Sequence, residues 1–289
     1  MEKYKIFTFA FLFILNINSN VFAWNVPGDI TFIGLEKLSK DVKKTVFSVQ
    51  TKNDKNEFTC LGTGFLLKHD NLVIGVTCFH VVEPILKTKK EISVGLNTKD
   101  GFKRFKGKVI ETDEDSDIAI LVFEKKSEEK IKLENLILDS KYLAENPKFT
   151  EGRAVLIPGY PLGIGAKHDQ NNPVIRFGIV AQYSEENTFL IDGVANPGNS
   201  GSPVFDMKEA KFIGMITSYK NDYINLFNQK GDLIAKLPYN SGLSSAVSSK
   251  VITKTLENLK TKLKTSNNSQ FSEPFPAASR LQKAADFGR

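Results

Sequence analysis

Short apolar stretches recur along most of the chain, and turn-forming residues separate them. Residues 45–51 alternate between apolar and polar side chains, whereas residues 118–123 form a continuous apolar run. Further strands are predicted at 62–67, 72–77, 91–96, 105–112, 154–157, 174–183, 188–191, 202–205 and 212–218. Many short strands at this spacing indicate an all-β sandwich or barrel, because βαβ units place longer helical segments between their strands.

Two features follow these strands. Residues 223–227 and 234–237 predict a hairpin across the polar segment 228–232. Residues 249–263 carry apolar side chains at helical spacing on one face and lysines elsewhere, which predicts a C-terminal helix. The expected fold is therefore all-β with one long helix at its end.

Apolar periodicity is weak between residues 126 and 150, where charged residues crowd. We expect this stretch to divide an N-terminal β-rich half (about 43–125) from a C-terminal one (about 150–248). The helix is expected at 249–264. Residues 265–289 turn to Ser, Asn, Gln, Pro and Ala, a composition that favours a flexible tail.

The first 23 residues are predicted to lie outside the fold. A short charged start is followed by an apolar run at 6–17, and Ala23 ends a small-residue cleavage pattern. This order is typical of a signal peptide, and the alternative is an uncleaved anchor helix. The apolar run is short for a membrane span, so we predict cleavage, a secreted or periplasmic location and no stable membrane insertion afterwards.

The net charge of +6 does not predict nucleic-acid binding. Residues 250–289 carry +5 of it and residues 1–23 carry +1, so residues 24–249 are neutral. The lysines near the C-terminus are not interleaved with aromatic residues that stack on bases. They indicate a solvated helix face. The pattern leaves the oligomeric state open.

Cys60 and Cys78 are the two cysteines of the chain. They lie beside two strands that are expected to be neighbours. Export to an oxidising compartment permits a disulfide, and burial in the core permits two free thiols. The sequence leaves both alternatives open.

The chain has three histidines, and His80 is the one placed for chemistry. His69 and His168 lie in polar, turn-like strings. His80 follows an apolar strand and precedes two valines, so a rigid core would hold its imidazole in place. The alternative is a structural histidine, which is weakened by suitable partners elsewhere in the chain.

Ser200 is the candidate nucleophile, because it lies in the string Gly198-Asn199-Ser200-Gly201. Small residues on both sides allow a tight turn that exposes the hydroxyl. The same turn can direct the N–H groups of Gly198 and Ser200 at one point, as an oxyanion hole requires. Taken alone, the string also fits a plain loop.

Asp117 is the candidate orienting acid. It directly precedes the apolar strand 118–123, near the core without full burial. A carboxylate there can hold an imidazole through its Nδ1–H. Asp113, Glu114 and Asp115 are close in sequence, and Asp117 is preferred because it abuts the strand. His80, Asp117 and Ser200 thus supply a base, an acid and a nucleophile for acyl transfer.

These residues lie in strings that resemble the trypsin-like serine protease superfamily, most closely the protease domain of bacterial HtrA/Deg-type enzymes. The similar strings are 62–66, 77–82, 116–121, 159–163, 178–180 and 192–201, in this order. The resemblance implies two perpendicular six-stranded antiparallel β-barrels, with a triad of His80, Asp117 and Ser200 between them. It also implies a serine endopeptidase that acts on protein or peptide substrates without a metal or organic cofactor.

The chain departs from the family pattern at several places. Ser202 stands where many members have Gly, and Cys78 stands where many have Asn. The loop at 219–241 is longer than usual. Only 25 residues follow Lys264, so we expect no PDZ domain of the HtrA type.

The resemblance places a specificity pocket beside the nucleophile. Its expected lining is Val194, Ala195, Thr217, Ser218 and Tyr219. No acid stands at the position that gives a preference for Arg or Lys, so we predict small or medium apolar P1 residues. The alternative to an enzyme is a catalytically silent barrel that binds peptides or proteins. Three scattered histidines and two cysteines do not match zinc-site spacing.

Overall fold

The computed structural model describes residues 32–69, 72–98, 101–124, 127, 131, 138–139, 150–166, 172–183 and 187–267, without the side chains of residues 32, 33, 139 and 263–267. The predicted signal peptide (1–23), most of the charged stretch 126–150 and the predicted tail beyond residue 267 lie outside the described residues. No helix in the described part of the chain is long and apolar enough to cross a membrane.

The N-terminal half is a barrel of six antiparallel strands. Their order is β1-β4-β5-β6-β3-β2, and pairing between β1 and β2 closes it. A short strand, β7 (Leu138–Asp139), runs parallel to β2. The six strands are β1 (Val46–Lys52), β2 (Phe58–His69), β3 (Leu72–Thr77), β4 (Ile92–Thr98), β5 (Gly101–Asp113) and β6 (Ile118–Phe123).

Phe47 fills the middle of this barrel and is fully buried. Gly64 and Gly75 face its ring so closely that a Cβ at either position would collide with it. Phe123 packs edge-on against Phe47, with ring centroids 6.4 Å apart. One aromatic side chain between two glycines therefore sets the packing of this core.

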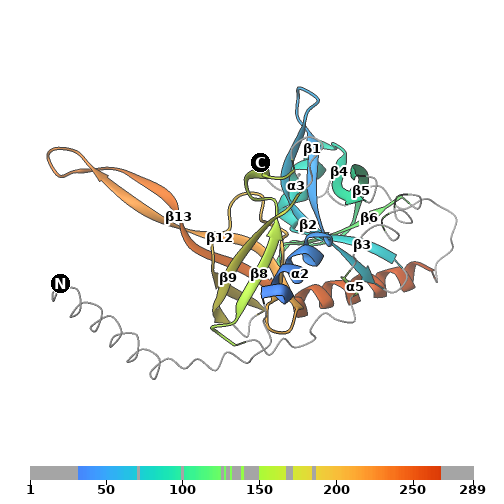
Figure 1. Cartoon of the computed structure of the whole chain (residues 1–289). Helices are drawn as coiled ribbons and strands as arrows, with labels where there is room; N and C mark the ends of the chain where they lie inside the picture. The colour runs from blue at the N-terminus through green and yellow to red at the C-terminus, as the bar shows by residue number, and fades with distance from the viewer. Residues whose placement is uncertain are drawn as a thin grey trace, which may run out of the picture.

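The C-terminal half is a second closed antiparallel barrel, with strand order β10-β13-β12-β11-β8-β9. The two-barrel prediction is thereby confirmed. The strands are β8 (Ala154–Gly159), β9 (Val174–Tyr183), β10 (Thr188–Asp192), β11 (Pro203–Asp206), β12 (Lys211–Phe227) and β13 (Leu233–Ser248). β12 and β13 run far beyond the barrel, and Figure 1 shows them leaving it as a long arm.

Aromatic contacts join the two barrels. Phe65 of β2 packs against Phe212 of β12 at 5.0 Å between ring centroids, and Phe205 of β11 lies 6.1 Å from the Phe212 ring. All three side chains belong to one buried cluster with residues of both barrels. Because this shared core fixes one barrel against the other, residues from both halves can form a single site.

In the described part of the chain, three helices and one 3-10 turn accompany the barrels. They are α2 (Phe32–Lys43), α3 (Phe79–Thr88), α5 (Ser249–Asn267) and η2 (Pro161–Gly163). The predicted C-terminal helix is present and continues to Asn267. The sequence pattern did not predict α2 or α3. Both are short, and Pro84 lies inside α3, so neither shows a long helical period.

Candidate active site

His80 lies in the first turn of α3, directly after β3. Cys78 is the N-cap residue in extended conformation, and the helix starts at Phe79. The imidazole is half-exposed, with 48% of the side-chain surface accessible. The sequence predicted that His80 follows a strand, and the structure shows that a helix also begins at this point. The imidazole is held at its base and open to solvent at its edge.

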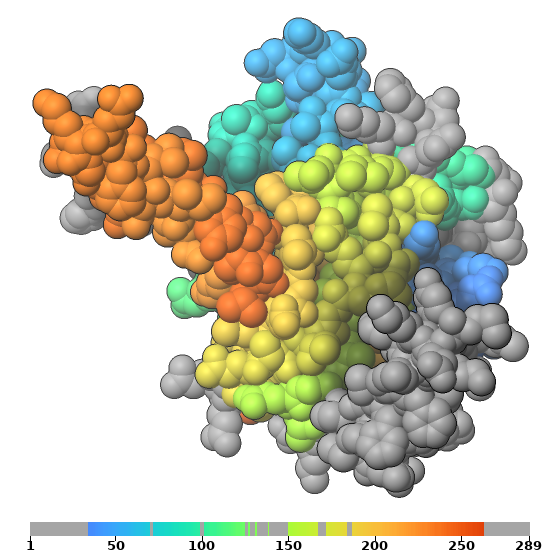
Figure 2. Space-filling view, turned by 60° about the vertical axis from the view of Figure 1, so that its left-hand side comes forward, coloured from blue at the N-terminus to red at the C-terminus, as the bar shows by residue number. Residues whose placement is uncertain are grey.

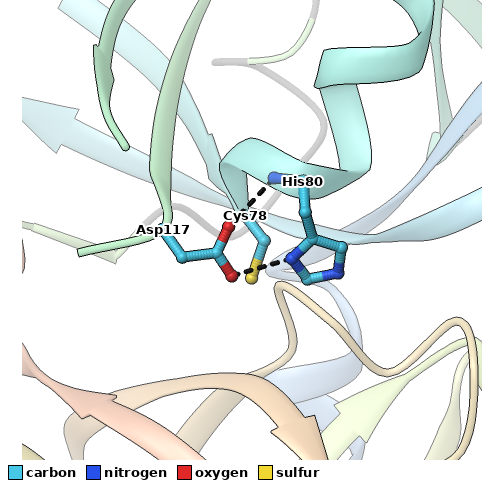
Figure 3. Close-up of side chains that lie close together, drawn as sticks. All are labelled: Cys78, His80 and Asp117. Atoms are coloured by element: carbon cyan, nitrogen blue, oxygen red, sulfur yellow. Dashed lines mark hydrogen bonds and ion pairs between the residues drawn. The ribbon is translucent and has the colours of Figure 1, made fainter. Parts of the chain in front are cut away.

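Asp117 faces His80 because β3 and β6 are paired neighbours. Thr77 pairs with Ala119, so the residue three positions after Thr77 and the residue two positions before Ala119 meet at one end of these strands. The Asp117 carboxylate accepts from the backbone N–H of His80 at 2.9 Å, and its second oxygen lies 2.7 Å from Nδ1 of the ring (Figure 3). Both oxygens thus fix one residue.

The backbone of Asp117 is in the left-handed region, with φ of 56°. Its N–H donates to the carbonyl of Glu114 at 3.2 Å, which closes a tight turn before β6. A non-glycine residue in this conformation is uncommon, and such residues concentrate at functional sites. Asp113 contacts Ser116 and Thr255 instead of the imidazole. The structure therefore pairs Asp117, and not its acidic neighbour Asp113, with His80.

Cys78 lies close to His80 and Asp117, and the sequence pattern did not predict a role for its thiol. Its side chain is fully buried, and Figure 3 shows the sulfur beside the Asp117 carboxylate. Sγ also donates to the carbonyl of Ile216 on β12 at 3.3 Å. Burial, and then the nearby charge of Asp117, raise the pKa of the Cys78 thiol well above its usual range. It is a neutral donor that connects the first barrel to the second.

Both cysteines are free thiols, so of the two alternatives that the sequence left open, the structure shows free thiols and not a disulfide. Ligand atoms of Cys78, His80 and Asp117 lie within 4.8 Å of one another, a cluster that sequence spacing did not indicate. Within it, Nδ1 of His80 is already engaged by Asp117. The contacts present are those of a hydrogen-bonded imidazole–carboxylate pair with a thiol beside it.

Ser200 lies on a turn of the second barrel that packs directly against the first. Its carbonyl accepts from the N–H of Thr63 on β2 at 2.9 Å. Gly201 has φ of 88°, and its N–H donates to the Ile216 carbonyl at 2.8 Å. A Cβ at position 201 would collide with the Thr63 carbonyl, so only glycine allows the turn to approach β2 this closely.

The Ser200 hydroxyl and the Cys78 thiol contact consecutive residues of β12. Ser200 Oγ donates to the Thr217 carbonyl at 3.3 Å, next to the Ile216 carbonyl that Cys78 uses. Cys78 is two residues from His80, so β12 contacts both the turn of the candidate nucleophile and the segment that carries His80. Among the contacts of the described residues, no hydrogen bond joins Ser200 Oγ to His80.

The turn before Ser200 presents two backbone N–H groups. The Pro197 carbonyl accepts from the N–H of Leu162 at 2.6 Å. In a trans peptide the C=O and the following N–H point in opposite directions, so the N–H of Gly198 points away from Leu162. Within the described part of the chain, neither this N–H nor that of Ser200 has a hydrogen-bond acceptor. Two such donors are what an oxyanion hole needs.

Thr63 holds this turn from the first barrel. Its hydroxyl donates to the Gly198 carbonyl at 2.7 Å and accepts from the N–H of Tyr160 at 3.0 Å. Gly198 itself has φ of 96°, and a Cβ there would collide with the Tyr160 carbonyl. The turn is therefore fixed from two sides, and its conformation requires glycine.

The predicted pocket residues lie on two segments near Ser200. Val194 is exposed and Ala195 is buried on the loop after β10, while Thr217, Ser218 and Tyr219 lie on β12. Two polar side chains of β13, not predicted from the sequence, hold that loop. Ser244 accepts from the Ala195 N–H at 3.0 Å, and the Asn240 amide donates to the Ala195 carbonyl and to Asn196.

Comparison with known proteins places this site in a family. The family model described as a trypsin-like peptidase domain matches residues 62–215, which is more than half of the chain. The chain belongs to the trypsin-like peptidase family. Peptidases are hydrolases of peptide bonds, and the matched segment contains His80, Asp117 and Ser200.

Solved structures agree on the fold. The crystal structure of Deg5 matches with a TM-score of 0.56 and 19% identity, over 78% of this chain and 94% of Deg5. The apo MamO protease domain from Magnetospirillum magneticum matches with a TM-score of 0.50 and 17% identity, over 74% of this chain and 96% of that domain. A search of curated proteins returned no match. The two-barrel architecture is thus shared with these proteins.

Proposed function

We propose that this trypsin-like peptidase is a serine endopeptidase that works through an acyl-enzyme. The observation that carries the proposal is the 2.7 Å contact between Nδ1 of His80 and Asp117, with Ser200 on the facing turn. Asp117 holds the imidazole with Nε2 directed away from the carboxylate. Nε2 is then the atom that takes the proton from Ser200 Oγ as the oxygen attacks a peptide carbonyl.

The unpaired N–H groups of Gly198 and Ser200 support the next step. Negative charge develops on the carbonyl oxygen as the tetrahedral intermediate forms, and preorganised donors stabilise it. His80 then donates its proton to the leaving amine, and the acyl group stays on Ser200. Water repeats the sequence and releases the acid, so bonds and protons balance without a further reactant.

Small or medium apolar P1 residues remain our proposed preference. Val194 and Ala195 supply apolar surface beside β12. The carboxylate of Asp192 lies before this loop and is exposed, so no acid is buried within it to attract Arg or Lys. A peptide-library cleavage profile of the wild-type chain beside Ser200→Ala tests this preference. Cleavage mainly after Arg or Lys would overturn it.

A fluorophosphonate probe tests the mechanism directly, because it reacts with an activated serine. We expect labelling at Ser200 in the wild type and none in Ser200→Ala or His80→Ala. The variant Ser202→Ala is the matched control, since it removes a neighbouring hydroxyl on the same turn. Equal labelling of Ser200→Ala and the wild type would remove Ser200 from the mechanism.

A second candidate is a catalytically silent barrel that binds peptides. The observation in its favour is that Ser200 Oγ donates to Thr217 and makes no hydrogen bond with His80 among the described contacts. The silent barrel predicts peptide binding without probe labelling. The endopeptidase predicts labelling and turnover of the same peptides.

We also propose export to a secreted or periplasmic location, on the basis of the predicted signal peptide 1–23. N-terminal sequencing of the protein from its native source is the test. A mature chain that starts at Trp24 supports export, and a retained residue 1 contradicts it.

A further inference from the structure

β12 and β13 continue beyond the second barrel and form an arm that belongs to neither barrel core. Residues 221–227 pair with residues 233–240 as a two-stranded ribbon, which we call the β12–β13 ribbon. Its tip is closed by Asn228, whose N–H donates to the Asp232 carbonyl at 2.9 Å and whose side chain accepts from the N–H groups of Lys230 and Asp232. Figures 1 and 2 show the ribbon standing clear of both barrels.

The ribbon exposes an unusual amount of apolar surface. Among the described residues, eight of the fifteen large exposed apolar side chains lie on it, so it is the main apolar surface of this part of the chain. They are Tyr223, Ile224, Leu226, Phe227, Leu233, Ile234, Leu237 and Tyr239. An exposed apolar patch of this kind marks an interaction site, and an isolated two-stranded ribbon is only marginally stable in water.

One face of the ribbon is almost free of charge. Residues that pair directly across strands share a face, which groups Ile224 with Leu237 and Leu226 with Ala235. The remaining pair on this face is Asp222 with Tyr239, whose hydroxyl donates to the carboxylate at 2.6 Å. The other face carries Asn225 opposite Lys236. The first face is thus suited to apolar side chains of a partner.

The outer edge of β12 is open along the ribbon. β11 pairs with β12 only between Lys211 and Met215. From Thr217 to Phe227, the registers of the described residues pair β12 with β13 alone. An unpaired strand edge presents N–H and C=O groups that can bind another extended chain.

This open edge begins at the candidate nucleophile. Ser200 Oγ donates to the Thr217 carbonyl, and β12 continues from there into the ribbon, with register shifts at Thr217 and Lys220. At ~3.3 Å per residue, the edge from Thr217 to Phe227 is roughly 35 Å long. A chain held at Ser200 therefore has an open strand edge along which to extend.

We propose that the β12–β13 ribbon is a substrate-binding arm for an extended polypeptide with apolar side chains. This inference rests on the proposed endopeptidase function. The substrate adds as a strand to the open edge of β12, and its apolar side chains contact Ile224 and extend the face that Ile224 forms with Leu237. Antiparallel pairing is the more stable arrangement and is the one used throughout this barrel. Since β12 runs outward from Ser200, the residues before the scissile bond lie on the ribbon.

The occupant is a substrate and not a second copy of this chain because of where the open edge leads. A second copy paired along the whole edge, as far as Thr217, would cover the hydroxyl of Ser200. An extended substrate uses the same edge and delivers its scissile bond to that hydroxyl.

The test compares three fluorogenic peptides with one common cleavage site taken from the library profile. One is short, one carries eight additional residues of alternating Val and Thr before the site, and one carries them after it. We expect the upstream extension to raise kcat/KM at least ~10-fold and the downstream extension to leave it unchanged. The double variant Ile224→Lys, Leu237→Lys should lose this gain and cleave the short peptide at the wild-type rate. Asn225→Lys, on the opposite face, is the matched control and should keep the gain.

A catalysis-independent measurement separates the two proposals. Fluorescence anisotropy of the labelled upstream-extended peptide on the full-length Ser200→Ala chain should show binding that the Ile224→Lys, Leu237→Lys variant loses. If Ser200 fails to react with a fluorophosphonate while this binding persists, the endopeptidase proposal falls and the arm stands. Equal binding by the Ser200→Ala chain with and without Ile224→Lys, Leu237→Lys would overturn the proposed arm. A dimer in light scattering that the Ile224→Lys, Leu237→Lys variant loses would also overturn it.

Discussion

The hydroxyl of Ser200 donates to the carbonyl of Thr217 at 3.3 Å, one residue along β12 from the carbonyl that anchors Cys78. β12 therefore contacts the candidate nucleophile and, through Cys78, the segment that carries His80 of the His80–Asp117 pair. Further out, the same strand forms one half of the ribbon. Catalytic hydrogen bonds are often loose in free enzymes and tighten when substrate binds. We expect rotation about the Cα–Cβ bond of Ser200 to replace its hydrogen bond to the Thr217 carbonyl by one to His80.

Asp117→Asn should lower kcat/KM by roughly 10³- to 10⁴-fold, because Asn stabilises the wrong imidazole tautomer and cannot stabilise imidazolium. The backbone should be unaffected, since Asn tolerates the left-handed conformation at this position. Steady-state kinetics and a thermal melt measure both effects. Asp113→Asn is the control, because Asp113 contacts Thr255 and not His80. Equal activities of the two variants would contradict the assignment of Asp117.

Gly198→Ala should lower kcat/KM by about 10²-fold or more, through loss of the donor geometry at the turn. The added Cβ meets the Tyr160 carbonyl and strains a residue with φ of 96°. Gly152→Ala controls for backbone strain alone, because Gly152 has φ of 85° and nothing within 4 Å of the new Cβ. We expect Gly152→Ala to lose ~1–2 kcal/mol of stability, Gly198→Ala to lose more because of the collision, and only Gly198→Ala to lose activity.

Cys78→Ala should lower the free energy of unfolding by about 1 kcal/mol or more. The variant loses a buried thiol and its hydrogen bond to the Ile216 carbonyl, which connects the two barrels. Cys78→Ser keeps a donor at this position and should recover part of the loss. Urea unfolding of the three proteins is the measurement. Equal free energies of unfolding for Cys78→Ala and the wild type would show that this contact does not stabilise the fold.

Alkaline pH should destabilise the fold through Cys60. Burial raises the pKa of this thiol to about 12 from 9.0. Between these values the unfolded chain loses the proton and the folded chain keeps it, so stability is complete below pH 9 and falls as pH rises toward 12. Urea midpoints between pH 8 and 11 should fall more steeply in the wild type than in Cys60→Ala. Parallel curves would mean that Cys60 does not contribute.

The strand pairing explains how far the site was predictable. β3 and β6 were both visible as apolar runs, and their antiparallel pairing brings the positions after Thr77 and before Ala119 to one end. The preference for Asp117 over Asp113 rested on its contact with the strand, and this pairing supplies the physical reason. The helix at His80 was missed because a ten-residue segment with an internal proline has no clear period.

Cys78 and the β13 residues that hold the specificity loop gave no local signal. A buried cysteine is usually a small apolar residue of the core, and nothing near Cys78 in sequence identifies Ile216 as its partner. Asn240 and Ser244 contact the 193–196 loop from a strand about fifty residues away. Contacts of this range depend on how the barrel closes.

The sequence by itself determined the two β-rich halves, the C-terminal helix and the residue types of the site, because apolar periodicity and turn residues act locally. Tertiary structure alone decided the rest. Packing of Phe65 on Phe212 sets one barrel against the other, and Ser200 and Cys78 contact neighbouring carbonyls of β12. It also decided that the predicted 223–237 hairpin is the continuation of β12 and β13, since strand length depends on pairing between distant residues and not on local propensity.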